Sequence, residues 1–299
     1  MTTPLDVSTL LPPAFDAPAD RRGEATLAMR YEDVTQDGRL GCRAMTHALA
    51  PTLWEKVLVT HPLAAPLRDD GVVPILSRIA VVSLEGPIAY GPLPHASGSF
   101  TLVRAIDAQG RARFRMDMSV SIDGVLGHTH GPPPADAGKP LALGRVHAEH
   151  VLTRPFGPPD RRRVDALPAG VRADRDDAWR GPEASLELPA GARWLDEDFV
   201  SDASVIAFGL GHTDANQHVN SLVYPHALEE AALRHARRPP RVSFCHHFEL
   251  AFRKPFFEGE RMRMELRAYE RGAAFGVIAR CVDASSGEPR TFGRLELVA

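Results

Sequence analysis

The sequence of 299 residues lacks several features that mark specialised classes of protein. Its three cysteines, Cys42, Cys245 and Cys281, are too few and too scattered for a disulfide framework or a zinc site. Its 35 Lys and Arg nearly balance its 38 Asp and Glu, which excludes the strongly basic surface of nucleic-acid-binding proteins. No apolar run approaches the ~20 residues that span a bilayer, and no signal-peptide pattern opens the chain. We therefore expect a cytoplasmic protein that binds neither nucleic acid nor a membrane.

Proline is plentiful but unevenly distributed, and it divides the sequence into two halves. Ten of the 26 prolines lie between Gly131 and Val200, where turn-forming residues replace any hydrophobic period. A chain of this length accommodates about two domains of roughly 150 residues each. We therefore expect four segments: an N-terminal extension at 1–23, a first unit at 24–135, a linker at 136–200 and a second unit at 201–299.

The two units share short sequence similarities that indicate an internal duplication. The matched pairs are Pro87 with Pro255 and Gly91 with Gly259 at an offset of 168, and Pro51 with Pro225 and Glu55 with Glu229 at an offset of 174. The two offsets are similar although they come from separate segments. This agreement predicts two copies of one unit, with a small insertion or deletion between the segments.

Hydrophobic periodicity predicts the same order of elements in each unit: a strand, a long helix and then several antiparallel strands. In the first unit we expect a helix at 46–60 and strands at 24–34, 72–84, 98–107, 111–122 and 125–129. In the second unit we expect a helix at 221–237 and strands at 203–211, 241–252, 261–270, 273–283 and 291–298. This order predicts the α+β class, with each antiparallel sheet wrapped around its helix.

Polar residues gather in one segment of the second unit, between its first strand and its helix. The cluster comprises His212, Asp214, Asn216, Gln217, His218 and Asn220. A turn followed by a helix cap accounts for one or two such residues, but not for all of them. The segment is therefore the strongest candidate for a functional site.

The run Asp214-Ala-Asn216-Gln-His218-Val219-Asn220, with Tyr224 four residues further on, resembles a known motif. It is most similar to the D-x-N-Q-H-V-N pattern of the acyl-acyl-carrier-protein thioesterases, which belong to the hotdog-fold thioesterases. The resemblance implies a tandem hotdog fold with the motif in the second unit. It also implies hydrolysis of an acyl thioester, linked to an acyl carrier protein or to CoA, without a metal or organic cofactor.

The resemblance assigns roles to individual residues. Asp214 would act as base, nucleophile or orienter, and Asn216 would polarise the thioester carbonyl or hold the water. His218 would act as a general base or as a partner to the reacting water. The backbone N–H groups of Val219, Asn220 and Ser221 lie where the helix is expected to begin, so they are candidates for binding an oxyanion. Tyr224 of the motif is expected to contact substrate.

The sequence departs from the family pattern in two places. An acidic or cysteine residue on a later strand of the family falls on Pro255 or Phe256 here, and neither can transfer a proton. Glu229 on the predicted helix is a candidate for the missing acid. The first unit has Cys42, Ala44 and Thr46 opposite Asn216, His218 and Asn220, so we expect it to be structural and the chain to have one active site.

Two other functions use the same fold and stay open at this point. Dehydratases of 3-hydroxyacyl thioesters favour a His/Asp or His/Glu pair in a different local pattern, and the motif here argues against them. A noncatalytic protein that binds acyl thioesters is the other alternative, because the strand acid is missing. Acyl chain length, the choice between CoA and carrier protein, and a homodimer formed through exposed sheet edges are not determined by the sequence.

Overall fold

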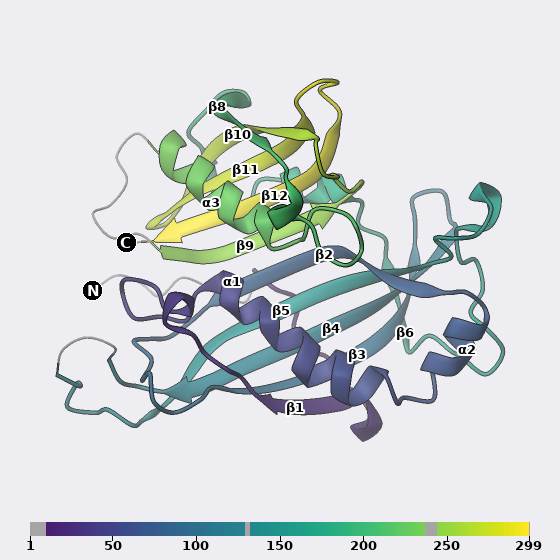
Figure 1. Ribbon diagram of the computed structural model, residues 1–299, viewed down its shortest axis with the longest axis horizontal. Helices are drawn as coiled ribbons and strands as arrows, with labels where there is room; N and C mark the ends of the chain where they lie inside the picture. The colour runs from purple at the N-terminus through teal and green to yellow at the C-terminus, as the bar shows by residue number, and fades with distance from the viewer. Residues whose placement is uncertain (1–9, 129–131, 237–243, 299) are drawn as a thin grey trace.

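The computed structural model describes residues 10–128, 132–236 and 244–298, and their strands form one continuous sheet (Figure 1). The strand order is β1-β3-β4-β5-β2-β9-β12-β11-β10-β7, with β6 beside β3 and β8 beside β10. All pairs are antiparallel except β3 with β6. The first five strands are β1 (Arg22–Thr26), β2 (Val73–Ser83), β3 (His95–Ile106), β4 (Ala112–Val125) and β5 (Pro140–Thr153). The later strands are β6 (Arg175–Ala178), β7 (Arg193–Trp194), β8 (Val200–Ala207), β9 (Phe244–Phe252), β10 (Arg261–Arg271), β11 (Ala274–Asp283) and β12 (Pro289–Val298).

The two units meet where β2 pairs with β9, in a register that runs from Arg78 opposite Ala251 to Val82 opposite His247. On the helical side of this sheet a single apolar core draws residues from both units, including Phe100, Met116 and Phe248. The similar sheets of the two units are thus joined edge to edge, and they share one interior.

The helices differ from the single long α-helix that we expected in each unit. In the first unit, α1 (Cys42–Met45), the 3-10 turn η4 (Thr46–Ala48) and the π-helical η5 (Ala50–Leu58) follow one another directly. Pro51 lies at the start of η5, where its missing N–H cannot complete an α-helical hydrogen bond. In the second unit, α3 (Val223–His235) has 13 residues. None of the described helices is long and apolar enough to cross a membrane.

Several short helical segments complete the chain. They are α2 (Ala64–Asp69) and the 3-10 turns η2 (Ala19–Arg21), η3 (Tyr31–Asp33), η6 (Pro159–Arg161), η7 (Pro182–Leu186) and η8 (Leu210–His212). In Figure 1, α3 lies over β9–β12 and the α1–η5 segment lies over β2–β5. Residues 237–243, where we expected the end of one helix and the start of a strand, lie outside the described residues.

The strand predictions hold for most of the sheet and are wrong at three places. The expected strand 24–34 is only β1, because its partner β3 begins at His95 opposite Thr26. In the expected strand 125–129, Leu126 forms only an isolated bridge with Ile88. β5 falls inside the range 136–200 that we expected to be a linker. The prolines on both sides of β5 obscured its alternation of apolar and polar residues.

The rest of the linker is held to the outer face of the sheet by buried charges. Arg78 of β2 donates to the Ser185 hydroxyl at 2.5 Å and pairs with Glu249 of β9. Glu249 also accepts from Ser185 at 2.8 Å and from Arg294 of β12 at 2.6 Å. These contacts join β2, β9 and η7, and so they tie the linker to both units at their junction.

Candidate functional site

The predicted site is a tight loop between η8 and α3. An isolated antiparallel bridge between Thr213 and Val219 closes it. Inside the bridge, the Asp214 N–H donates to the His218 carbonyl at 3.2 Å and the Gln217 N–H donates to the Asp214 carbonyl at 2.9 Å. Gln217 has a φ of 62°, a left-handed conformation that is uncommon outside glycine. The loop is therefore a defined turn that presents Asp214, Asn216 and His218 together.

Both carboxylate oxygens of Asp214 accept hydrogen bonds from this loop. Oδ1 accepts the Asn216 N–H at 2.9 Å, and Oδ2 accepts the Asn220 side-chain amide at 3.0 Å. The other end of the Asn220 amide, Oδ1, accepts the Leu222 N–H at 2.8 Å, just before α3. Asp214 and Asn220 therefore connect the turn to the first residues of the helix, and this connection fixes the orientation of the carboxylate.

His218 and Asn216 are both accessible to solvent. Asn216 is exposed, and His218 is half-buried. The His218 Nδ1 atom lies 3.3 Å from the Val219 carbonyl oxygen. A carbonyl oxygen only accepts, so this hydrogen bond requires the proton on Nδ1 and leaves Nε2 with a free lone pair. That tautomer suits a group that takes a proton from water.

Two of the three expected oxyanion donors are engaged elsewhere. The Val219 N–H donates to the Phe256 carbonyl at 2.8 Å, and the Asn220 N–H donates to the His212 carbonyl at 2.8 Å. The expectation for these two N–H groups was therefore wrong. The reason is that α3 begins only at Val223, and the residues before it pair with neighbouring backbone instead. Ser221 is the remaining expected donor.

Tyr224 lies in the core below the loop, which corrects its expected role in contacting substrate. The side chain is 1% exposed. Its ring centroid lies 5.6 Å from that of Phe252, 6.4 Å from Phe256 and 6.5 Å from Phe208. Burial raises the pKa of Tyr224 well above its usual range. The aromatic cluster supports the loop from beneath, and Tyr224 remains a neutral part of it.

Glu229, the candidate helix acid, lies on α3 near the contact between the two units. It is six residues beyond the start of α3, about 9 Å along the helix axis. Burial raises the pKa of Glu229, and the nearby charges of His226 and Arg43 oppose this effect. Its charge also acts on Cys245, whose backbone carbonyl accepts the Cys42 thiol at 3.0 Å. Glu229 thus lies within electrostatic range of Arg43 in α1 and of Cys245 in β9.

The first unit contains an equivalent loop that sequence comparison missed. An isolated bridge between Val34 and Leu40 matches the bridge between Thr213 and Val219, and both pairs differ by 179 residues. Gly38, which corresponds to Gln217, also has a positive φ, of 85°. The Gly38 N–H donates to the Thr35 carbonyl at 2.9 Å, as Gln217 does to Asp214.

The same offset aligns the two helical segments by their buried positions. The buried pairs at this offset are Met45 with Tyr224, Ala48 with Ala227, Leu49 with Leu228, Thr52 with Ala231 and Leu53 with Ala232. The offset of 174, inferred from Pro51 with Pro225 and Glu55 with Glu229, was therefore wrong, because these two matches arose by chance. Aligning the helical spacing of the apolar residues, rather than the prolines, would have favoured the offset of 179.

The corrected alignment changes the expected character of the first unit. Asp37, Arg39 and Gly41, rather than Cys42, Ala44 and Thr46, lie opposite Asn216, His218 and Asn220. Arg39 Nε donates to Asp37 Oδ2 at 2.8 Å. The Arg39 guanidinium also stacks on the ring of Phe244 in β9, 4.6 Å from its centroid. The first loop does have polar side chains, and they bind one another and the second unit.

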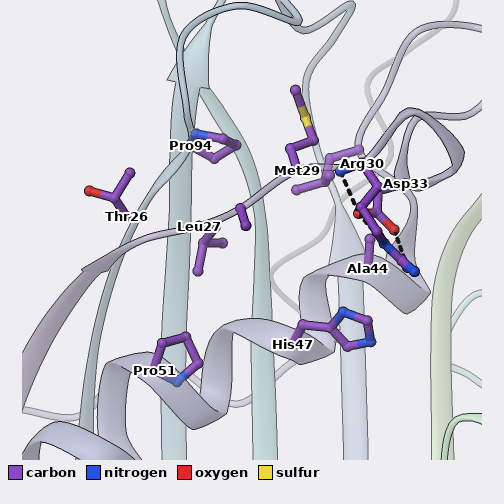
Figure 2. A pocket seen from close by; sticks show the side chains of 11 residues that line it. Thr26, Leu27, Met29, Arg30, Asp33, Ala44, His47, Pro51 and Pro94 are labelled. Atoms are coloured by element: carbon purple, nitrogen blue, oxygen red, sulfur yellow. Dashed lines mark hydrogen bonds and ion pairs between the residues drawn. The ribbon is translucent and has the colours of Figure 1, made fainter.

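A hollow of about 380 Å³ lies beside this first loop, between the chain that leaves β1 and the α1–η5 segment. Figure 2 shows the Arg30–Asp33 ion pair at one end of it, near Ala44 and His47.

The described residues contain no candidate metal site. Among them, no three His, Cys, Asp or Glu side chains are grouped closely enough to hold a metal ion.

Comparisons with known proteins give structural matches only. No family model matches the sequence, and no curated protein matches it. A structure assigned as an oleoyl thioesterase from Lactobacillus plantarum has 13% identity and a TM-score of 0.58, over 94% of this chain and 96% of that chain. An acyl-ACP thioesterase from Bacteroides thetaiotaomicron has 16% identity and a TM-score of 0.56, over 93% and 97%. The 12:0-ACP thioesterase from Umbellularia californica has 15% identity and a TM-score of 0.56, over 95% and 99%.

These matches show the fold. The chain has the tandem hotdog architecture expected from its motif, and the likeness extends over nearly the whole length of each neighbour.

Proposed function

We propose that this protein hydrolyses acyl thioesters to a free acid and a thiol. The observation that carries the proposal is the loop of Asp214, Asn216 and His218, held in a defined turn in the second unit of a tandem hotdog fold. Structures with this fold over more than nine-tenths of the chain are named acyl-ACP thioesterases. A thioester linked to an acyl carrier protein is therefore the first substrate to test, with acyl-CoA as the second.

His218 is the general base in this proposal. Its Nε2 lone pair accepts a proton from a water molecule as the water oxygen attacks the thioester carbonyl. A positioned general base typically contributes ~10²–10⁴-fold to the rate. Collapse of the tetrahedral intermediate then breaks the C–S bond, and the proton held by His218 passes to the departing thiolate.

Asp214 orients the site in this proposal and does not attack the substrate. Its two oxygens already accept from the Asn216 N–H and the Asn220 amide. A carboxylate that accepts one hydrogen bond from the turn on each oxygen is well placed to hold the turn, and we assign it that role.

Asn216 and Ser221 supply the hydrogen bonds to the developing oxyanion. The Asn216 side chain is exposed and ends in two N–H donors. The Ser221 N–H lies at the entry to α3, where the helix dipole also favours negative charge. Loss of one such donor typically costs roughly 10²–10³-fold in turnover.

Release of free thiol from a panel of acyl carrier protein and CoA thioesters of different chain lengths tests the proposal. Thiol formation that is lost in His218→Ala supports it. An enoyl product without free thiol would identify a dehydratase, and binding without either product would identify a noncatalytic acyl-thioester protein. Both of these outcomes contradict hydrolysis.

A further inference from the structure

The hollow in the first unit is lined mainly by aliphatic side chains. Its volume of about 380 Å³ lies within the range of roughly 300–1,000 Å³ that is usual for small-molecule sites. The lining residues are Thr26, Leu27, Ala28, Met29, Arg30, Asp33, Leu40, Ala44, His47, Pro51 and Pro94. None of these is Phe, Tyr or Trp, and the imidazole of His47 is the one aromatic ring among them. Met29 adds a flexible side chain that adapts to irregular apolar shapes.

The two units differ at the position of the lining residue Met29. Met29 corresponds to Phe208 at the offset of 179 residues. Phe208 is 3% exposed, and its ring centroid lies 5.3 Å from that of Phe256 and 5.8 Å from that of His212. Phe208 is thus fully buried, whereas its counterpart Met29 is half-buried and lines the hollow.

The polar end of the hollow has its charges balanced. Arg30 Nη2 donates to Asp33 Oδ1 at 2.8 Å, and Arg30 Nη1 lies 3.3 Å from Glu32. Burial would raise the pKa of Asp33, but hydrogen bonds from Arg30 outweigh this effect and hold the pKa below its usual range. Asp33 therefore stays ionised and neutralises Arg30. A ligand carboxylate here would meet two acidic side chains as well as one guanidinium.

Exposed apolar side chains lie next to the hollow in the sequence. Tyr31 and Tyr90 are 54% and 43% exposed, and their rings contact edge to face with centroids 5.9 Å apart. Leu93, next to the lining residue Pro94, is 55% exposed. The chain beside the hollow therefore carries several large apolar side chains that are exposed to solvent.

We propose that the hollow binds the aliphatic chain of a single-chain ligand whose headgroup is uncharged. The aliphatic lining receives the chain, and the balanced Arg30–Asp33 pair, with the imidazole of His47, faces a hydroxyl or ester headgroup. The site is separate from the Asp214 loop and goes beyond the proposed hydrolysis. A binding measurement therefore tests it independently of whether the protein cleaves thioesters.

Octan-1-ol is a suitable probe, with octanoate as its charged counterpart. In protein labelled with ¹³C at the methionine methyl groups, octan-1-ol is expected to shift the Met29 resonance saturably. The spectrum of Met29→Phe identifies this resonance among those of the seven methionines. Calorimetry is expected to show octanoate binding at least tenfold more weakly than octan-1-ol. Equal or tighter binding of octanoate would overturn the proposal that the headgroup of the ligand is uncharged.

Two substitutions fill the hollow, so that one failure to fold does not prevent the test. Met29→Phe introduces the residue that the second unit has at the equivalent position, Phe208. Ala44→Leu adds side-chain volume to the hollow from α1. Each is expected to weaken octan-1-ol binding at least tenfold. The control is Val59→Ala, an apolar position that is 71% exposed and does not line the hollow. Unchanged affinity in either folded filling variant, or no saturable shift of Met29 in the wild type, overturns the proposal.

Discussion

Arg39 and His218 occupy equivalent positions in two loops with the same backbone hydrogen bonds. The Arg39 carbonyl accepts the Thr35 N–H at 2.9 Å, and the His218 carbonyl accepts the Asp214 N–H at 3.2 Å. Arg39 is bound to Asp37 and stacked on Phe244 across the unit contact. The His218 ring, in contrast, forms its hydrogen bond within its own loop, to the Val219 carbonyl. One turn of backbone therefore serves as a clamp in the first unit and as the candidate site in the second.

Arg39→Ala is expected to lower stability without lowering turnover. The substitution removes a largely sheltered ion pair and a cation–π contact, together worth roughly 1–2 kcal/mol. Urea unfolding monitored by circular dichroism measures this loss. The matched control is Arg68→Ala, whose side chain is 75% exposed, and it should change stability little. A turnover loss beyond twofold in folded Arg39→Ala would contradict a purely structural role.

His218→Ala is expected to reduce kcat/KM for thioester hydrolysis by ~10²–10⁴-fold, because the general base is lost. Thiol release gives the rate, and circular dichroism checks that the fold survives. His226→Ala, at an exposed position on α3, is the matched control and should stay within about twofold of the wild type. Wild-type turnover in His218→Ala would remove His218 from the mechanism.

Exchanging the Asp214 and Asn220 side chains separates the roles open to Asp214. Asp214→Asn alone leaves two amide groups facing each other, and loss of a charge-assisted hydrogen bond is expected to cost about 10–10²-fold in kcat/KM. Adding Asn220→Asp restores one donor and one acceptor, and the new carboxylate still accepts the Leu222 N–H. If Asp214 orients the loop, the double variant recovers most of the activity.

The same two variants are expected to behave differently if Asp214 takes part directly in the reaction. If Asp214 is the nucleophile or the general base, the amide at position 214 stays inactive whatever lies at position 220. A double variant that is folded and as slow as Asp214→Asn would therefore exclude the orienting role. Chemical quench of single turnovers would then show whether an acyl intermediate accumulates in the wild type.

Stability is expected to fall as the pH drops from about 6.5 towards 4, because buried histidines cannot take up protons in the folded state. Burial lowers the pKa of His150 from 6.5 to about 4, and burial also lowers that of His247 to about 3. The unfolded chain binds these protons first, so stability is full above pH 6.5 and decreases below it. For His150 the loss by pH 4 is about 3 kcal/mol. Urea unfolding between pH 7 and pH 4 measures the slope.

His150→Leu should flatten this slope, whereas the control His95→Ala, with a side chain that is 50% exposed, should leave it unchanged. An identical slope in His150→Leu would show that His150 does not titrate as described. Below about pH 4.5 a second loss is expected from Glu249. Burial would raise its pKa, but Arg294 and Arg78 lower it to about 2, so its contribution disappears as the pH falls from 4.5 towards 2.

Local patterns in the sequence determined much of this architecture. Alternation of apolar and polar residues located β4 and β10, because successive side chains of a strand point to opposite faces of the sheet and one face packs on the apolar core. The density of polar residues from His212 to Asn220 located the candidate loop, because backbone capping alone does not need so many. The motif within that loop indicated the tandem hotdog fold, which the structural matches confirm.

Tertiary structure alone decided which of these groups are available. The motif places Val219, Asn220 and Tyr224 close to Asp214 in the sequence. In the structure, however, the Val219 N–H is bound to the Phe256 carbonyl and the Asn220 N–H to the His212 carbonyl. The Tyr224 side chain is buried in the core. Those partners are distant in sequence or lie on the opposite side of the turn, so no local pattern could reveal them. The clamp of Arg39 on Phe244 depends in the same way on β2 pairing with β9. The hydrophobic period and composition of a segment are local properties of the sequence. Whether a hydrogen-bond donor is already bound depends on which distant segments pack against it.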